Sequence, residues 1–181
     1  MVGITEISAV VATIGVLVAA IYYIILLRHN TRAREMEICR LVVSDYISEQ
    51  AIERWATMIN MQWKDEKDFL EKYGFSNPEG CGIWASWFYA WEMMGILLKN
   101  KVVRAEEMHD LGGYSAIYAW EKFKDIIQFL RDFLWGQDFL SNAEFFAQEM
   151  LKIKMKKDAS FKDKLETYKE DLRTLSRSKT S

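Results

Sequence analysis

The chain has 181 residues, with 24 Lys and Arg against 26 Asp and Glu, so its formal net charge is −2. Half of the residues are hydrophobic and 14% are aromatic, which excludes a disordered chain and is typical of a globular one. This charge balance excludes a dedicated nucleic-acid-binding protein, and we expect no nucleic-acid partner. A single proline and nine scattered glycines favour long helices over a sheet.

The N-terminal region predicts a membrane anchor. Residues 7–27 carry no charge, and 21 residues of helix span about 30 Å, the thickness of the hydrocarbon core. A cleaved signal peptide is disfavoured, because residues 1–6 hold no Lys or Arg and no small-residue cleavage site follows the apolar run. We therefore predict a short extracytoplasmic N-terminus at residues 1–6 and a transmembrane helix at 7–27.

The charged flanks predict the orientation of this anchor. Arg28, Arg32, Arg34 and Arg40 follow the apolar run, and no basic residue precedes it. By the positive-inside rule, we predict a single-pass protein of the cell membrane. Its N-terminus lies outside the cell, and the chain after the anchor lies in the cytoplasm. The two cysteines, at positions 39 and 81, have no paired spacing and agree with a reducing compartment.

Small residues form a stripe along the predicted anchor. Ser8, Ala12, Gly15 and Ala19 are spaced by 4, 3 and 4 residues, which places them on one helix face. Small residues let two membrane helices approach closely, so this stripe is a candidate pairing face. The alternative is that small residues are common in any membrane span and have no pairing role here.

Helix signals continue in chain order after the anchor. Residues 31–60 favour a continuation as helix, with a break where the apolar phase slips near residues 45–49. Residues 62–73 predict a short amphipathic helix that Gly74 ends. Asn77 and Pro78 then mark the start of an apolar helix over 79–99, which is either a core helix or a membrane-embedded segment.

The remaining signals predict four further helices. A short one at 104–111 is closed by Gly112 and Gly113, and a long one at 114–135 ends at Gly136. Ser141 and Glu144 form a capping-box pattern for a helix that reaches about residue 157. We expect an all-α protein, with one helical bundle domain at 28–157, a C-terminal amphipathic helix at 158–176 and a disordered tail at 177–181.

The C-terminal helix carries an apolar seam. The residues that repeat at intervals of 4, 3, 4 and 3 are Phe161, Leu165, Tyr168, Leu172 and Leu175. This is the a/d pattern of a helix that pairs with another helix. Residues 152–181 also carry 10 basic against 5 acidic residues, so contact of this basic tail with anionic lipid is a further hypothesis.

The domain resembles an uncharacterised prokaryotic family of membrane-anchored helical proteins. The resemblance rests on the Trp-Glu-x-x-Gly pattern of Trp91, Glu92 and Gly95, on the short acidic helix that follows, and on a further helix with Trp120 and Arg131. It covers most of residues 38–155. The family is a domain of unknown function, so the resemblance implies this architecture and no activity.

Few residues suggest chemistry. Glu106 and His109 stand at i and i+3, a spacing that can place two metal ligands on one helix face, and Glu92, Glu121 and Glu144 lie on neighbouring predicted helices. A carboxylate-bridged metal site needs a second such pair, which the sequence lacks. We therefore expect no metal, no cofactor and no catalytic residue, and a solvated acidic helix is the alternative for Glu106 and His109.

Glu92 lies within an aromatic helix and needs a partner, because an unpaired buried charge is costly. Arg131 falls on the inward side of its predicted helix, so we predict a structural ion pair between Glu92 and Arg131.

These patterns favour a membrane-anchored interaction or accessory subunit without catalytic activity. Its partners would be the lipid bilayer and either a second copy of the chain or another membrane protein. The alternative is a membrane-bound metal- or ligand-binding helical protein that uses Glu106, His109, Glu92 and Glu121.

Overall fold

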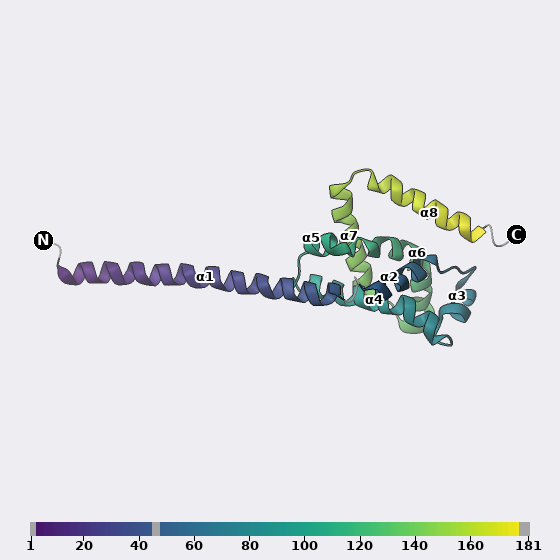
Figure 1. Cartoon of the computed structure of the whole chain (residues 1–181), viewed down its shortest axis with the longest axis horizontal. Helices are drawn as coiled ribbons and strands as arrows, with labels where there is room; N and C mark the ends of the chain where they lie inside the picture. The colour runs from purple at the N-terminus through teal and green to yellow at the C-terminus, as the bar shows by residue number, and fades with distance from the viewer. Residues whose placement is uncertain (1–2, 45–47, 178–181) are drawn as a thin grey trace. The chain divides into compact units, whose positions relative to one another are not determined.

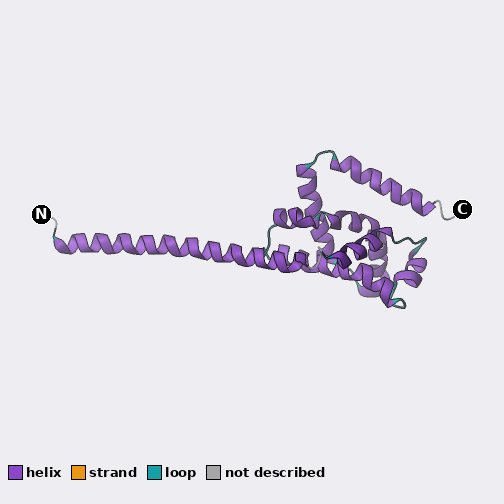
Figure 2. Cartoon of the chain, in the orientation of Figure 1, coloured by secondary structure: helices purple, strands orange, loops and turns teal. Residues whose placement is uncertain are grey.

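The computed structural model describes residues 3–44 and 48–177, and within these ranges it contains helices and turns but no strand (Figure 2). This confirms the all-α prediction. In chain order the elements are α1 (Ile4–Ser44), α2 (Glu49–Asn60), α3 (Glu66–Tyr73), α4 (Pro78–Lys99), α5 (Ala105–Met108), η1 (His109–Gly113), α6 (Ser115–Leu130), η2 (Arg131–Trp135), α7 (Ser141–Lys157) and α8 (Phe161–Arg177). Figure 1 labels the helices α1 to α8. The chain divides into two compact units, residues 1–41 and 42–181.

The first unit consists of helix α1. Among the described residues, the segment Val11–Ile38 is the one helical stretch that is long and apolar enough to cross a membrane, a property that signal sequences share. Side chains from Val11 to Leu27 are all exposed within the chain itself. The helix starts at Ile4 and continues to Ser44, so it extends beyond both ends of the predicted span at 7–27.

The second unit is built around helix α4. Helices α2, α3 and α7 all pack on α4, and α7 also packs on α6. The apolar all-round pattern of residues 79–99 is thus that of a core helix, the first of the two alternatives, and the side chains that fill the interior come from six elements. The largest fully buried ones are Phe69, Phe88, Phe123, Phe146, Phe161, Met58, Ile117, Ile127, Leu130 and Met150.

The predicted start of α4 is confirmed in atomic detail. The side chain of Asn77 accepts a hydrogen bond from the backbone N–H of Gly80 at 3.2 Å, and Pro78 occupies the first turn. Proline is well tolerated there because its missing N–H would have no partner within the helix. The indole of Trp84 also donates to the carbonyl of Tyr73 at 2.8 Å, which fixes α3 to α4.

Glycines end two helices at the predicted positions, but through wide turns. Gly112 has the non-helical angle φ 97° and makes a kink within η1, and Gly136 has φ 86° directly after the π-helical turn η2. Only glycine adopts such angles without steric cost. The predicted helix at 104–111 therefore leads into a kink at Gly112, and the predicted helix at 114–135 consists of an α-helical part followed by a π-turn.

The start of α7 differs from the predicted capping box. Ser141 is the first helical residue, and the preceding Leu140 has the left-handed angles φ 54° and ψ 30° and makes no side-chain cap. The backbone N–H of Ala143 instead donates to the carboxylate of Glu92, which belongs to α4. The local pattern failed because a charged group from another helix occupies the position of the cap.

Helices α4 and α7 approach each other closely at Gly95. A Cβ atom added at Gly95 would lie 2.1 Å from the backbone oxygen of Asn142, in the first turn of α7. No side chain fits in that space. The Trp-Glu-x-x-Gly pattern thus places a carboxylate at Glu92 and an open surface at Gly95 against the same end of α7.

We expect Gly95→Ala to destabilise the domain by about 1–3 kcal/mol, because α7 must move away from α4. Gly82→Ala is the matched control, since a Cβ at Gly82 in the same helix would meet nothing within 4 Å. Alanine at this exposed helical position should be neutral or stabilise by up to about 1 kcal/mol. Denaturant unfolding of both variants checks this, and equal effects would contradict the close approach.

Candidate functional site

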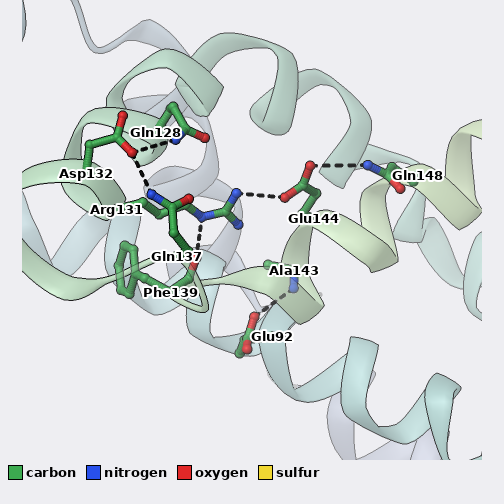
Figure 3. A network of polar contacts seen from close by, with 9 residues as sticks. All are labelled: Glu92, Gln128, Arg131, Asp132, Gln137, Phe139, Ala143, Glu144 and Gln148. Atoms are coloured by element: carbon green, nitrogen blue, oxygen red, sulfur yellow. Dashed lines mark hydrogen bonds and ion pairs between the residues drawn. The ribbon is translucent and has the colours of Figure 1, made fainter.

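Glu92 and the first turn of α7 form the best-defined polar contact in the domain (Figure 3). One carboxylate oxygen accepts from the side-chain amide of Asn142 at 2.6 Å, and the other accepts from the backbone N–H of Ala143 at 2.7 Å. The amide oxygen of Asn142 accepts in turn from the ammonium of Lys99 at 2.6 Å. A negative charge at this position satisfies a free N–H and complements the positive end of the helix dipole.

Arg131 has different partners from those predicted. Its Nε donates to the carbonyl of Phe139 at 2.8 Å, and its Nη1 forms an ion pair with Glu144 at 2.8 Å. Its guanidinium also lies 5.7 Å from the ring centre of Trp120. The predicted pair between Glu92 and Arg131 is therefore wrong: both residues face α7, but each contacts a different part of it.

These contacts hold elements together and leave little free chemistry. Arg131 belongs to the π-turn η2, and its bonds to Phe139 and Glu144 fasten that turn to the connection before α7 and to α7 itself. Next to Arg131 in Figure 3, Gln128 and Gln137 both donate hydrogen bonds to Asp132, at 2.9 and 2.6 Å. The carboxylate of Glu92 is occupied by two donors, so we assign it a structural role.

The candidate metal ligands do not come together. His109 is 6% exposed and its Nδ1 lies 2.9 Å from Asp110, whereas Glu106 is exposed. Lys157 from α7 also pairs with Asp110. Glu121 forms ion pairs with Lys124 at 2.9 Å and Lys169 at 3.5 Å. Within the described ranges, no group of three or more His, Cys, Asp or Glu side chains is arranged to hold a metal ion.

The predicted seam of α8 is used within the chain. Phe161 and Leu165 are 1% and 3% exposed. The ring of Tyr118 in α6 packs edge-on against Phe161 at 5.9 Å and Tyr168 at 5.1 Å. The side chains of Leu172 and Leu175 lie outside the described residues. The described half of the seam is therefore a contact with α6, not a free surface for a partner.

The lysines of the basic tail also have partners in the chain. Lys152 pairs with Glu149 at 2.5 Å, and Lys154 lies 5.2 Å from the ring centre of Tyr114. With Lys157 bound to Asp110, these contacts weaken the case for a free lipid-binding surface on α7.

By contrast, the described part of the small-residue stripe on α1 is exposed. Ala12, Gly15 and Ala19 are exposed, while the side chain of Ser8 lies outside the described residues.

A cavity of about 230 Å³ lies between α2, α4 and the η1 turn, and no pattern in the sequence predicted it. Its lining residues are Ile52, Trp55, Trp87, Trp91, Met94, Met108, Leu111, Gly112, Gly113 and Ser115. The ring of Trp55 lies edge-on to Trp87 at 5.5 Å and to Trp91 at 6.0 Å. Tryptophans at helical spacing indicate a buried face, and the same residues here form both the core and the cavity wall.

Lys122 of α6 is partly buried at the end of α2. Its ammonium donates to the backbone carbonyl of Ile59 and lies 5.5 Å from the ring centre of Trp63. Burial lowers the pKa of Lys122 from 10.5 to about 8. A cation at the C-terminal end of a helix is favourable, but desolvation opposes it here.

The Glu92 and Arg131 contacts predict a pattern of coupling. We expect Glu92→Gln to destabilise by about 1–2 kcal/mol, because the cap loses its charge. In double-mutant cycles, Arg131→Met should couple strongly with Glu144→Gln and only weakly with Glu92→Gln. Denaturant unfolding measures both cycles. A stronger coupling between positions 92 and 131 would contradict this assignment and restore the predicted pair.

Lys122 predicts a pH dependence of stability. Because the folded chain releases this proton near pH 8 and the unfolded chain near 10.5, the unfolded chain binds more protons between these values. Stability therefore rises with pH across this window through this group. Lys122→Met should stabilise the chain at pH 7 and remove this part of the rise. Lys67→Met, at a lysine side chain 86% exposed on α3, is the control and should leave the pH profile unchanged.

Comparison with known proteins identifies a family. No curated protein and no solved structure matches the chain. A family model described as a domain of unknown function, DUF4760, matches residues 9–150, which reach from the apolar part of α1 into α7. The match includes Trp91, Glu92 and Gly95 and stops before α8. It extends over well more than half of the sequence, and the chain therefore belongs to the DUF4760 family.

Proposed function

We propose that the chain is a single-pass membrane-anchored interaction protein, an accessory subunit rather than an enzyme. One observation carries this proposal: the described side chains of the apolar run in α1 are exposed. None of the side chains in the most apolar part of the segment Val11–Ile38 is buried. Contiguous apolar surface of this length is stable only in lipid or against another apolar surface.

The orientation in this proposal follows from charge. The arginines that come after the apolar run, beginning with Arg28, favour retention of that end in the cytoplasm. The helical domain, residues 42–181, would then work on the cytoplasmic side of a cell membrane.

Two surfaces support contact with a partner. The first is the face of α1 around Gly15. A Cβ at Gly15 would meet nothing within 4 Å, so close packing within the described chain does not require glycine there. The stripe around it is suited to a second membrane helix. The other surface surrounds η2, where Phe133 and Leu134 are 73% and 54% exposed and Phe75, 65% exposed, contacts the ring of Trp135 at 5.0 Å. Clustered exposed aromatic residues are typical of interaction sites.

The alternative of a metal-binding protein receives no support from the arrangement of its candidate residues. Glu92 caps α7, Glu121 pairs with Lys124 and Lys169, and His109 contacts Asp110. Ligand binding at a different place in the domain remains compatible with the accessory role.

Native mass tests the proposal. We expect the full chain to stay in membranes after an alkaline wash, and to form a complex of defined mass when a mild detergent extracts it. Gly15→Leu should reduce that mass, because a bulky side chain prevents close helix approach. Val16→Leu, at the neighbouring residue outside the stripe, should leave the mass unchanged. Release by the alkaline wash would contradict the anchor, and a wild-type monomer would contradict the interaction role.

A further inference from the structure

We infer that the cavity between α2, α4 and η1 binds one uncharged apolar group, with the size of a bicyclic ring or a short stretch of alkyl chain. We refer to it as the tryptophan pocket, and its walls are the ten residues given above. The inference stands on the geometry of the second unit and does not require the proposed membrane attachment.

The lining determines the class of ligand. No charged side chain lines the pocket, whose walls are three indoles, two thioethers, two aliphatic side chains, the glycines of η1 and Ser115. A charged group would lose its hydration there without gaining a partner. Indole and thioether groups instead offer large, polarisable surfaces to an apolar ring or chain.

The size of the pocket limits the ligand. Its volume of about 230 Å³ is roughly one and a half times that of an engineered apolar cavity that binds benzene. At about 30 Å³ for each water-sized atom, the pocket holds about eight non-hydrogen atoms. This matches a bicyclic ring or an eight-carbon segment of an alkyl chain, and a whole lipid is excluded.

The backbone of η1 keeps this volume open. Gly112 lies in the wall with φ 97°, and a Cβ added to it would meet nothing within 4 Å. The adjacent Gly113 serves close packing instead, because a Cβ there would lie 2.6 Å from the backbone oxygen of Met108. Unfilled apolar volume is destabilising in a core whose only role is packing. A wall in which Gly112 leaves apolar volume unfilled fits a pocket that is filled by a ligand.

The pocket also has an entrance. Ile52 and Leu111 are 59% and 42% exposed, while Trp87 and Trp91 are 7% and 2% exposed. The pocket therefore opens at its aliphatic residues and is closed at its indoles. Helix α2, which supplies Ile52 and Trp55, has Met58 as its single buried residue and packs mainly on α4.

The chain's own tryptophans provide the readout. All seven lie at position 55 or later, so none is in the predicted span at 7–27. We would reconstitute the full chain in phosphatidylcholine nanodiscs and titrate it with 1-bromooctane, whose bromine quenches nearby indoles. We expect saturable quenching. Quenching that rises linearly with the probe, as in simple partition into lipid, would overturn the proposal.

Two variants and a control locate the binding. Ser115→Phe adds side-chain volume at the pocket wall and should weaken binding of 1-bromooctane by roughly tenfold or more, as a blocked site requires. Ser86→Phe, at an exposed serine of α4 outside the pocket, should leave it unchanged. If Ser115→Phe does not fold, Ile52→Phe narrows the entrance from an exposed position and should weaken binding as well. Unchanged binding in the pocket variants would overturn the proposal.

A second arm identifies the source of the group. Nanodiscs made with phosphatidylcholine brominated on its acyl chains replace the free probe. Quenching that Ser115→Phe removes would assign a lipid acyl chain as the ligand. Saturable quenching by 1-bromooctane alone would assign a free small molecule. Either result supports the pocket, and the absence of both contradicts it.

Discussion

The contact between α4 and the first turn of α7 is the constraint on which the domain depends. Glu92 supplies a carboxylate to the Ala143 N–H, and Gly95, three residues later on the same helix face, lets the backbone of Asn142 come within van der Waals distance. The two residues act together. The cap requires close approach, and close approach would leave a buried N–H without a partner if the cap were absent.

Other features follow from this contact. Because Glu92 caps α7, Glu144 is available to bind Arg131, and Arg131 in turn holds η2. Helix α4 presents Glu92 and Gly95 to α7, and it lines the tryptophan pocket with Trp87, Trp91 and Met94. The position of the pocket wall is therefore set by the same helix contact. The Trp-Glu-x-x-Gly pattern thus positions the helix that lines the proposed ligand pocket.

Sequence signals predicted local structure well and distant partners poorly. Asn77 and Pro78 mark the start of α4 because capping depends on neighbouring residues, and Gly112 and Gly136 interrupt helices at positive φ angles. Gly74 follows α3 with extended backbone angles. Periodicity also placed Arg131 on a buried face.

The partner of Arg131 was predicted wrongly, because several carboxylates on neighbouring helices satisfy the same pattern. The capping box at Ser141 failed for the same reason: a local signal does not contain the competing carboxylate of Glu92. The seam of α8 indicated a paired face correctly, but the pattern alone does not distinguish α6 of the same chain from a second copy. The tryptophan pocket was not predicted, because tryptophans buried in a core and tryptophans that line a cavity recur at the same helical spacing.

The cap by Glu92 is the central claim, and amide hydrogen exchange at Ala143 tests it most directly. A first-turn amide of a helix ordinarily exchanges quickly, because it has no partner within the helix. The contact with Glu92 predicts slow exchange at Ala143, similar to that of buried amides in α4, and rapid exchange in Glu92→Gln. Rapid exchange at Ala143 in the unaltered chain would contradict the account.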